Sequence, residues 1–111
     1  MKILFASDIH GSAYYCRRLL DIYKETKASR MVILGDILYH GPRNDLPKEY
    51  APKEVIAMLN PLKDQIYAVR GNCDTEVDQM VLQFPILADY ALLVLDGKTF
   101  YATHGHVFNQ D

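Results

Sequence analysis

The sequence contains neither an apolar run long enough to span a membrane nor an excess of basic residues. Asp8 and His10 interrupt the apolar start of the chain too early for the hydrophobic segment of a signal peptide. The 12 lysines and arginines are scattered and are balanced by 14 aspartates and glutamates. These absences argue against a membrane protein, a secreted protein and a nucleic-acid-binding surface.

Cysteine is also scarce, because the chain has only two, Cys16 and Cys73. Cys16 falls in a helical pattern and Cys73 in a polar stretch, so the pair does not suggest a disulfide framework. We therefore expect a reducing compartment, the cytoplasm. No G-x-G-x-x-G motif follows the first apolar run, which argues against a dinucleotide-binding protein. A length of 111 residues predicts one domain, residues 1–111.

Short apolar runs predict buried parallel strands, packed on both faces. They are residues 2–6, 31–34 and 66–69. Two further β-rich runs, residues 91–95 and 99–103, flank Asp96-Gly97, which is a strong signal for a β-hairpin. The sequence contains no internal repeat.

Helical patterns connect the strands. Ser12 stands where an N-cap is expected for the first helix, and Asn60-Pro61 closes the second. Thr75 and Asp78 resemble a capping box before a third, short helix, which we expect Pro85 to stop. The predicted order is therefore β-α-β-α-β followed by a hairpin, an α/β fold.

Polar residues that could bind a metal or take part in catalysis follow the ends of the predicted strands. In a parallel sheet such residues converge, because the carboxyl ends of the strands share one edge. The clusters are Asp8-Ile9-His10-Gly11, Gly35-Asp36, Gly71-Asn72-Cys73-Asp74 and His104-Gly105-His106.

The combination of carboxylates, imidazoles and an amide predicts a metal site. Asp8 and His10 lie two residues apart and can face the same ion, whereas the two oxygens of Asp36 can bridge two ions. Asn72 offers a neutral carbonyl oxygen. This donor set suits manganese, iron, zinc, nickel or cobalt better than calcium. Taken singly, Asp8 can equally cap a helix and Gly35-Asp36 can form an ordinary turn.

The ordered motifs D-x-H, G-D, G-N-C-D and H-G-H resemble those of the calcineurin-like metallophosphoesterases, in particular the small bacterial YfcE-type branch. The resemblance implies a four-layer α/β/β/α sandwich with two divalent metal ions, for which manganese is our first choice. One ion would be held by Asp8, His10 and Asp36, the other by Asp36, Asn72 and His104.

The resemblance also implies roles around the ions. Most of the family has a histidine where this chain has Cys73, so a weakly donating thiol would replace an imidazole at the leaving group. Asp74 would be a partner of Cys73 behind the metals. Arg70 or His106 would offset negative charge that develops on the phosphate.

The family's final G-H-x-H motif is not present, so the sequence resembles the N-terminal part of a family member. We expect a metal-dependent phosphodiesterase for small phosphodiesters, acting through a water activated by two metals, with the 111 residues alone poorly active. A non-catalytic scaffold on the same fold, as in the retromer coat, and an inactive fragment are the alternatives. Homo-oligomerisation is left open.

Overall fold

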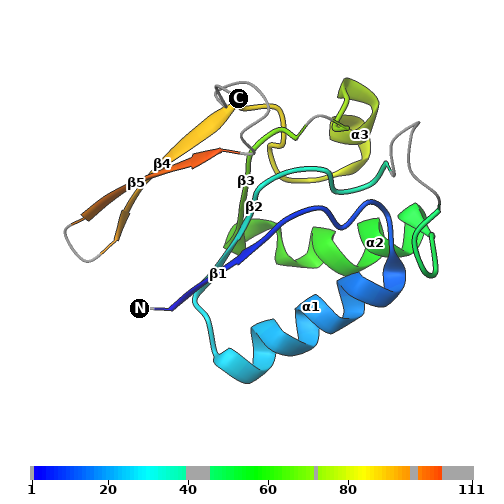
Figure 1. The fold of residues 1–111 in the computed structure, drawn as a ribbon, viewed down its shortest axis with the longest axis horizontal. Coiled ribbons are helices and arrows are strands. Elements are labelled where there is room, and N and C mark those ends of the chain that lie inside the picture. The colour runs from blue at the N-terminus through cyan, green and yellow to red at the C-terminus, as the bar shows by residue number, and fades with distance from the viewer. Residues whose placement is uncertain (1, 40–45, 72, 96–97, 104–111) are drawn as a thin grey trace.

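A computed structural model describes residues 2–39, 46–71, 73–95 and 98–103 (Figure 1). The elements in order are β1 Ile3–Ala6, α1 Ala13–Thr26, β2 Arg30–Ile33, α2 Pro52–Leu59, the 3₁₀ helix η1 Asn60–Gln65, β3 Ile66–Ala68, α3 Glu76–Val81, β4 Tyr90–Leu95 and β5 Lys98–Thr103. The expected α/β order is confirmed. Among the described helices, none has the length and apolar character that a membrane crossing requires.

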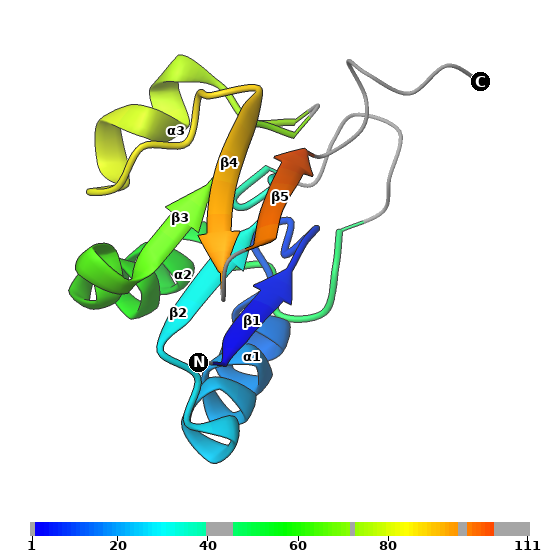
Figure 2. The ribbon, with the colours of Figure 1, turned by 90° about the vertical axis from the view of Figure 1, so that its left-hand side faces the viewer.

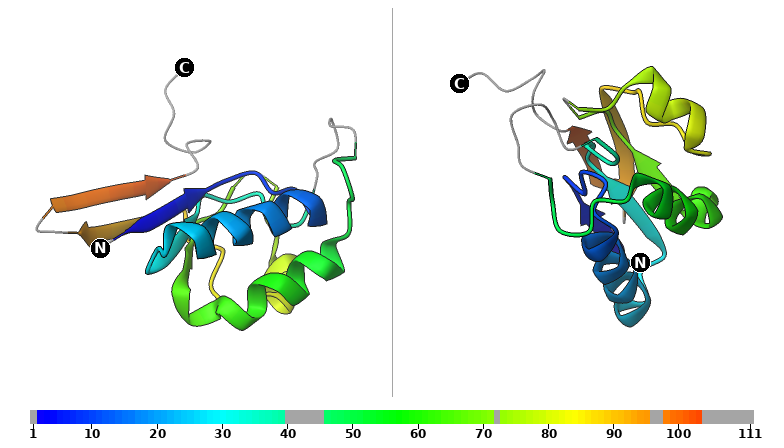
Figure 3. Two further views of the ribbon diagram at one scale, coloured as in Figure 1. Left: turned by 90° about the horizontal axis from the view of Figure 1, so that it is seen from below. Right: turned by 90° about the vertical axis from the view of Figure 1, so that its right-hand side faces the viewer.

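The three N-terminal strands form a parallel sheet in the order β1-β2-β3, and β4 pairs with β5 as a separate antiparallel hairpin. The helices α1 and α2 cover one face of the parallel sheet, and the hairpin lies on the other side (Figures 2 and 3). The described chain therefore stacks as helices, parallel sheet and hairpin. Asp96 and Gly97, the predicted hairpin turn, lie outside the described residues.

The hydrophobic core lies between the parallel sheet and the two helices. Alternate residues of the strands point to this side, because side chains of a strand alternate between faces. Burying one large apolar side chain stabilises a fold by about 1.5–3 kcal/mol, so this face contributes strongly to stability. Its buried members include Met31, Ile33 and Ile66 from the strands, Cys16 and Tyr23 from α1, and Val55 and Leu59 from α2.

The opposite face of the sheet is less covered than the sequence predicts. Phe5, Val32 and Tyr67 are aligned in one row across β1, β2 and β3. Val32 in the central strand is buried, but Phe5 is 45% and Tyr67 49% exposed. Burial on both faces is therefore correct for the central strand β2 and wrong for the flanking strands β1 and β3, where Phe5 and Tyr67 are about half exposed.

The predicted capping box at the start of α3 is confirmed. The hydroxyl of Thr75 accepts a hydrogen bond from the backbone N–H of Asp78 at 3.4 Å, and the Asp78 carboxylate accepts one from the N–H of Thr75 at 3.1 Å. The helix ends at Val81, however, and not at Pro85.

The side chain of Gln79 accounts for this early end. Its amide nitrogen donates to the carbonyl oxygens of Leu82 at 3.3 Å and Phe84 at 3.0 Å, and its amide oxygen accepts from the N–H of Ile86 at 2.7 Å. A side chain that satisfies backbone groups beyond the helix removes the need for further helical hydrogen bonds. Phe84 is consequently free to enter the core, where it is buried.

Replacing Ser12 by alanine should destabilise the protein by about 1–2 kcal/mol, the upper range for an N-cap loss. The buried Ser12 hydroxyl accepts from the N–H of Tyr15 at 3.2 Å and also donates to the carbonyl of Lys48. Urea unfolding measures the change, with the same substitution at exposed Ser29 as the control. Equal stability of the two variants would contradict the double role of Ser12.

Candidate metal centre

The segments that leave β1 and β2 continue side by side beyond the ends of the strands. The backbone N–H of Asp8 donates to the carbonyl of Gly35 at 3.1 Å, and that of His10 donates to the carbonyl of Asp36 at 2.8 Å. Two of the predicted clusters are thereby brought together at the carboxyl edge of the sheet, where a parallel α/β fold collects its functional residues.

Three predicted ligands adopt a backbone conformation that side chains rarely accept. The φ angles are +59° at Asp8, +52° at His10 and +55° at Asp36. The left-handed conformation costs an ordinary residue roughly 1–2 kcal/mol, so it persists where the surrounding structure enforces it. Such conformations concentrate at functional sites, and here they fall on the predicted ligands of one ion.

The ring of His10 is oriented by a backbone group. Its Nδ1 lies 2.9 Å from the carbonyl oxygen of Tyr39, and since a carbonyl only accepts, Nδ1 carries the proton. Its Nε2 lies 3.1 Å from Asp8 Oδ1 and 3.8 Å from Asp36 Oδ2, so the other ring nitrogen faces two carboxylates. Metal-binding histidines commonly donate their other N–H to a carbonyl in this way.

Sequence reasoning did not find the part played by Tyr39. Its contribution is a backbone carbonyl, a group that every residue carries, so the identity of the side chain holds no signal for it. Only the path of the chain after Asp36 brings this carbonyl to the imidazole of His10.

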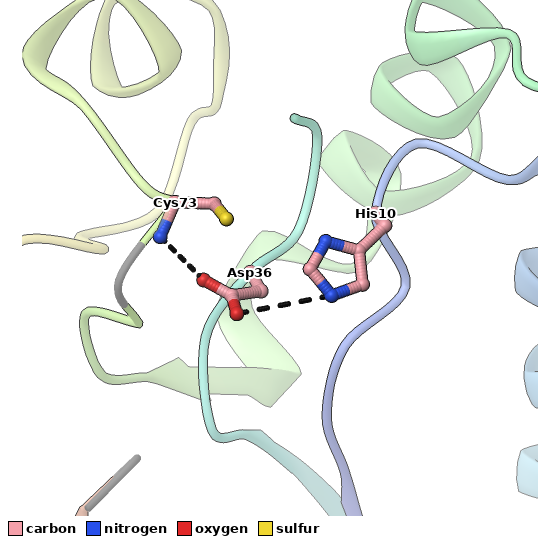
Figure 4. A group of neighbouring side chains, drawn as sticks. All are labelled: His10, Asp36 and Cys73. Carbon is pink, nitrogen blue, oxygen red and sulfur yellow. Dashed lines mark hydrogen bonds and ion pairs between the residues drawn. The ribbon is translucent and has the colours of Figure 1, made fainter. Parts of the chain in front are cut away.

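The thiol of Cys73 completes a group of three donors with His10 and Asp36 (Figure 4). One ligand atom from each residue lies within 4.8 Å of the other two. The backbone N–H of Cys73 also donates to Asp36 Oδ1 at 2.7 Å. Burial, together with the negative charges of Asp36 and Asp74, raises the pKa of the Cys73 thiol to about 11. In this acidic surrounding the thiol keeps its proton at neutral pH.

Two glycines allow the loops after β2 and β3 to touch. A Cβ at Gly35 would lie 2.3 Å from the backbone nitrogen of Gly71, and a Cβ at Gly71 would lie 2.3 Å from Asp36 Oδ1. Gly35 also has a φ of +101°. The absence of a side chain at both positions therefore permits the close approach of the two loops.

Asp74 is buried behind the same two loops. Its carboxylate accepts hydrogen bonds from the backbone N–H groups of Asp36 at 2.7 Å, Ile37 at 3.0 Å and Gly71 at 2.7 Å. The sequence predicts Asp74 as a partner of the Cys73 thiol. Its hydrogen bonds connect it instead to the backbone that carries Asp36.

The remaining predicted site residues are placed in part. Arg70 follows β3 with an exposed side chain, and its backbone N–H donates to the carbonyl of Ala88 at 2.7 Å. Asn72, His104 and His106 lie outside the described residues. The structure thus brings Asp8, His10, Asp36 and Cys73 together. Of the three residues predicted to bind the second ion, Asp36 is the one that the structure describes.

A parallel sheet that gathers carboxylate and imidazole groups at its carboxyl edge is suited to binding metal ions, and the family comparison agrees. The model of the calcineurin-like phosphoesterase family matches residues 1–111, so the chain belongs to that family. The resemblance inferred from the sequence motifs is confirmed.

Relatives within the family include phosphodiesterase YfcE from Escherichia coli, in strains K12 and O157:H7. Each is 50% identical to this chain over 111 residues, and the chain spans 60% of their length.

Solved structures agree with the fold. That of Escherichia coli YfcE, described as a phosphoesterase, superposes with a TM-score of 0.94 over 96% of this chain and 59% of that one, at 50% identity. An archaeal phosphodiesterase gives a TM-score of 0.67 at 25% identity, over 96% of this chain and 60% of its own.

Family membership implies divalent metal ions, and the described donors fit such ions. An imidazole nitrogen, carboxylate oxygens and a sulfur suit transition metals. His10 Nε2 lies 3.1 Å from an oxygen of Asp8 and 3.8 Å from an oxygen of Asp36, so the three side chains present possible ligand atoms at one place. These three residues would hold the ion.

Replacing Asp36 by alanine should weaken manganese binding by more than the roughly 10–100-fold typical of losing a residue behind the ligands. Asp36 faces both His10 and the β3 loop, so its loss removes donor oxygens from the centre of the site. Calorimetric titration of metal-stripped protein measures the affinity. The control is the same substitution at exposed Asp64 in η1, and equal affinities in the two variants would refute the assignment.

Proposed function

We propose that this chain carries the catalytic centre of a metal-dependent phosphodiesterase. The observation that supports the proposal most directly is the convergence of the side chains of Asp8, His10 and Asp36, all three of which have a positive φ. A scaffold has no physical need to hold these groups in a strained arrangement.

Divalent ions, for which we propose manganese, supply Lewis acidity by polarising phosphoryl oxygens and lowering the pKa of water. The two oxygens of Asp36 face different neighbours, Oδ2 toward His10 and Oδ1 toward the β3 loop. That orientation supports Asp36 as the ligand shared by both ions. Asn72 and His104 remain our proposed further ligands of the second ion.

The proposed reaction favours diesters with good leaving groups. Because its pKa is raised to about 11, Cys73 offers a neutral S–H, which is a weaker donor than an imidazolium. Protonation of a poor leaving group would therefore receive little help from this position. Exposed Arg70, and His106 by the family pattern, are proposed to offset the negative charge of the phosphate.

The surface beside Asp8 offers room for a small diester. A hollow of about 390 Å³ is lined by Asp8 together with Ala6, Ser7, Ile9, Tyr15 and Leu19. Its mixed apolar and polar walls would accept the organic part of such a substrate. Both cysteines are free thiols, which supports the reducing cytoplasm as the site of action.

Hydrolysis of bis(p-nitrophenyl) phosphate in the presence of manganese tests the proposal. From the 111 residues alone we expect slow release of nitrophenol that a chelator abolishes and that an Asp8→Ala substitution lowers at least ~10-fold, because Asp8 adjoins the imidazole of His10. An Asp64→Ala variant should retain the wild-type rate. Turnover that is insensitive to both the chelator and Asp8→Ala would contradict a metal-dependent reaction.

Substituting Cys73 by histidine should extend activity toward monoesters and poor leaving groups. An imidazolium can protonate an alkoxide, and such help is typically worth about 10²–10⁴ in rate. The informative measurement is the ratio of rates on an aryl diester and an alkyl monoester, with Cys73→Ser as the control that adds no imidazole. The same ratio in the wild type and both variants would show that residue 73 does not select the leaving group.

A further inference from the structure

Asp74 is an acidic side chain that is only 1% exposed, and no cationic side chain among the described residues forms an ion pair with it. Its charge is satisfied by backbone donors. Three N–H groups, from Asp36, Ile37 and Gly71, donate to it over distances of 2.7–3.0 Å. Hydrogen bonds to an ionised acceptor are roughly twice as strong as neutral ones, so this carboxylate holds the backbone firmly.

The three bonds tie together two loops that are far apart in the sequence. Asp74 Oδ2 accepts from Asp36 in the β2 loop and from Gly71 in the β3 loop, while Oδ1 accepts from Ile37. Asp36 returns the contact, because its Oδ1 accepts from the N–H of Cys73, the neighbour of Asp74. Each aspartate thus binds the backbone of the other's loop, and we call this pair of contacts the Asp36–Asp74 clasp.

The clasp acts on a residue whose conformation needs enforcement. Asp36 has a φ of +55°, and it lies where the Gly35 and Gly71 loops are so close that neither glycine could carry a side chain. Without Asp74, the backbone N–H groups of Asp36 and Ile37 would lose the carboxylate that accepts their hydrogen bonds. The φ angle of Asp36 would lose its restraint at the same time. A ligand that must adopt a strained conformation only on binding metal binds it more weakly.

We infer that Asp74 is a positioning residue of the metal centre, which sets metal affinity through the backbone of Asp36 without itself contacting metal or substrate. The inference rests on the proposed metal site at Asp36. It differs from the sequence-based role, in which Asp74 serves the thiol of Cys73.

Two substitutions separate the effect of where the Asp74 oxygens lie from the effect of their negative charge. Asp74→Asn keeps the size of the side chain, but its NH₂ group would face an N–H donor and its negative charge is lost. Asp74→Glu keeps the charge on a longer side chain that cannot place both oxygens at the same donors. If position matters, both variants should lose affinity; if the negative charge alone matters, only the asparagine variant should.

Calorimetric titration of manganese into the metal-stripped protein tests this. We expect affinity to fall about 10–100-fold in both Asp74 variants, the range found when groups that orient metal ligands are removed. The matched control is Asp78→Asn, which removes a carboxylate that caps α3 through Thr75. Circular dichroism checks that the variants are folded. Wild-type affinity in Asp74→Glu, or equal affinity in Asp74→Asn and Asp78→Asn, would overturn the inference.

Amide hydrogen exchange provides a test that needs no variant. In metal-free wild-type protein the N–H groups of Asp36, Ile37 and Gly71 should be as protected as those of β2, because Asp74 holds them in the absence of metal. Rapid exchange at these amides would overturn the inference even if Asp74→Asn fails to fold. A wild-type protein that shows protection but no manganese affinity would overturn the proposed metal site and with it the role of Asp74.

Discussion

The close contact between the loops after β2 and β3 is the constraint on which the site depends. Gly35 and Gly71 leave no room for a side chain between them, and Asp36 is held between the two loops with a positive φ. Its carboxylate is thereby presented to His10 on one side and to the β3 loop on the other. The carboxylate of Asp36 can face His10 and the β3 loop at the same time only because the two loops meet at this distance.

This arrangement is electrostatically costly for the protein alone. The carboxylates of Asp8, Asp36 and Asp74 all lie near Cys73, and after burial their negative charges help to raise the pKa of its thiol. Natural proteins accept local conflicts of this kind at functional sites and offset them by stability elsewhere. Here the offset comes from the core between α1, α2 and the parallel sheet.

The residues of this chain determine much of the fold by local means. Apolar runs mark the parallel strands, Ser12 and the Thr75–Asp78 capping box begin helices where expected, and Asn60 marks the end of α2. These features were predictable because strand burial and helix capping depend on neighbours within a few positions. The metal-ligand candidates were also readable, since each follows a strand and parallel strands share one carboxyl edge.

The folded structure decided the features that the local sequence pattern does not specify. Gln79 ends α3 before Pro85 by binding backbone beyond the helix, and the exposure of Phe5 and Tyr67 depends on what covers the sheet. The carbonyl that orients His10 belongs to the backbone of Tyr39, and the N–H groups that donate hydrogen bonds to Asp74 are also backbone groups. Every residue possesses such atoms, so the sequence distinguishes none of them, and only the folded path of the chain selects the ones that form the site.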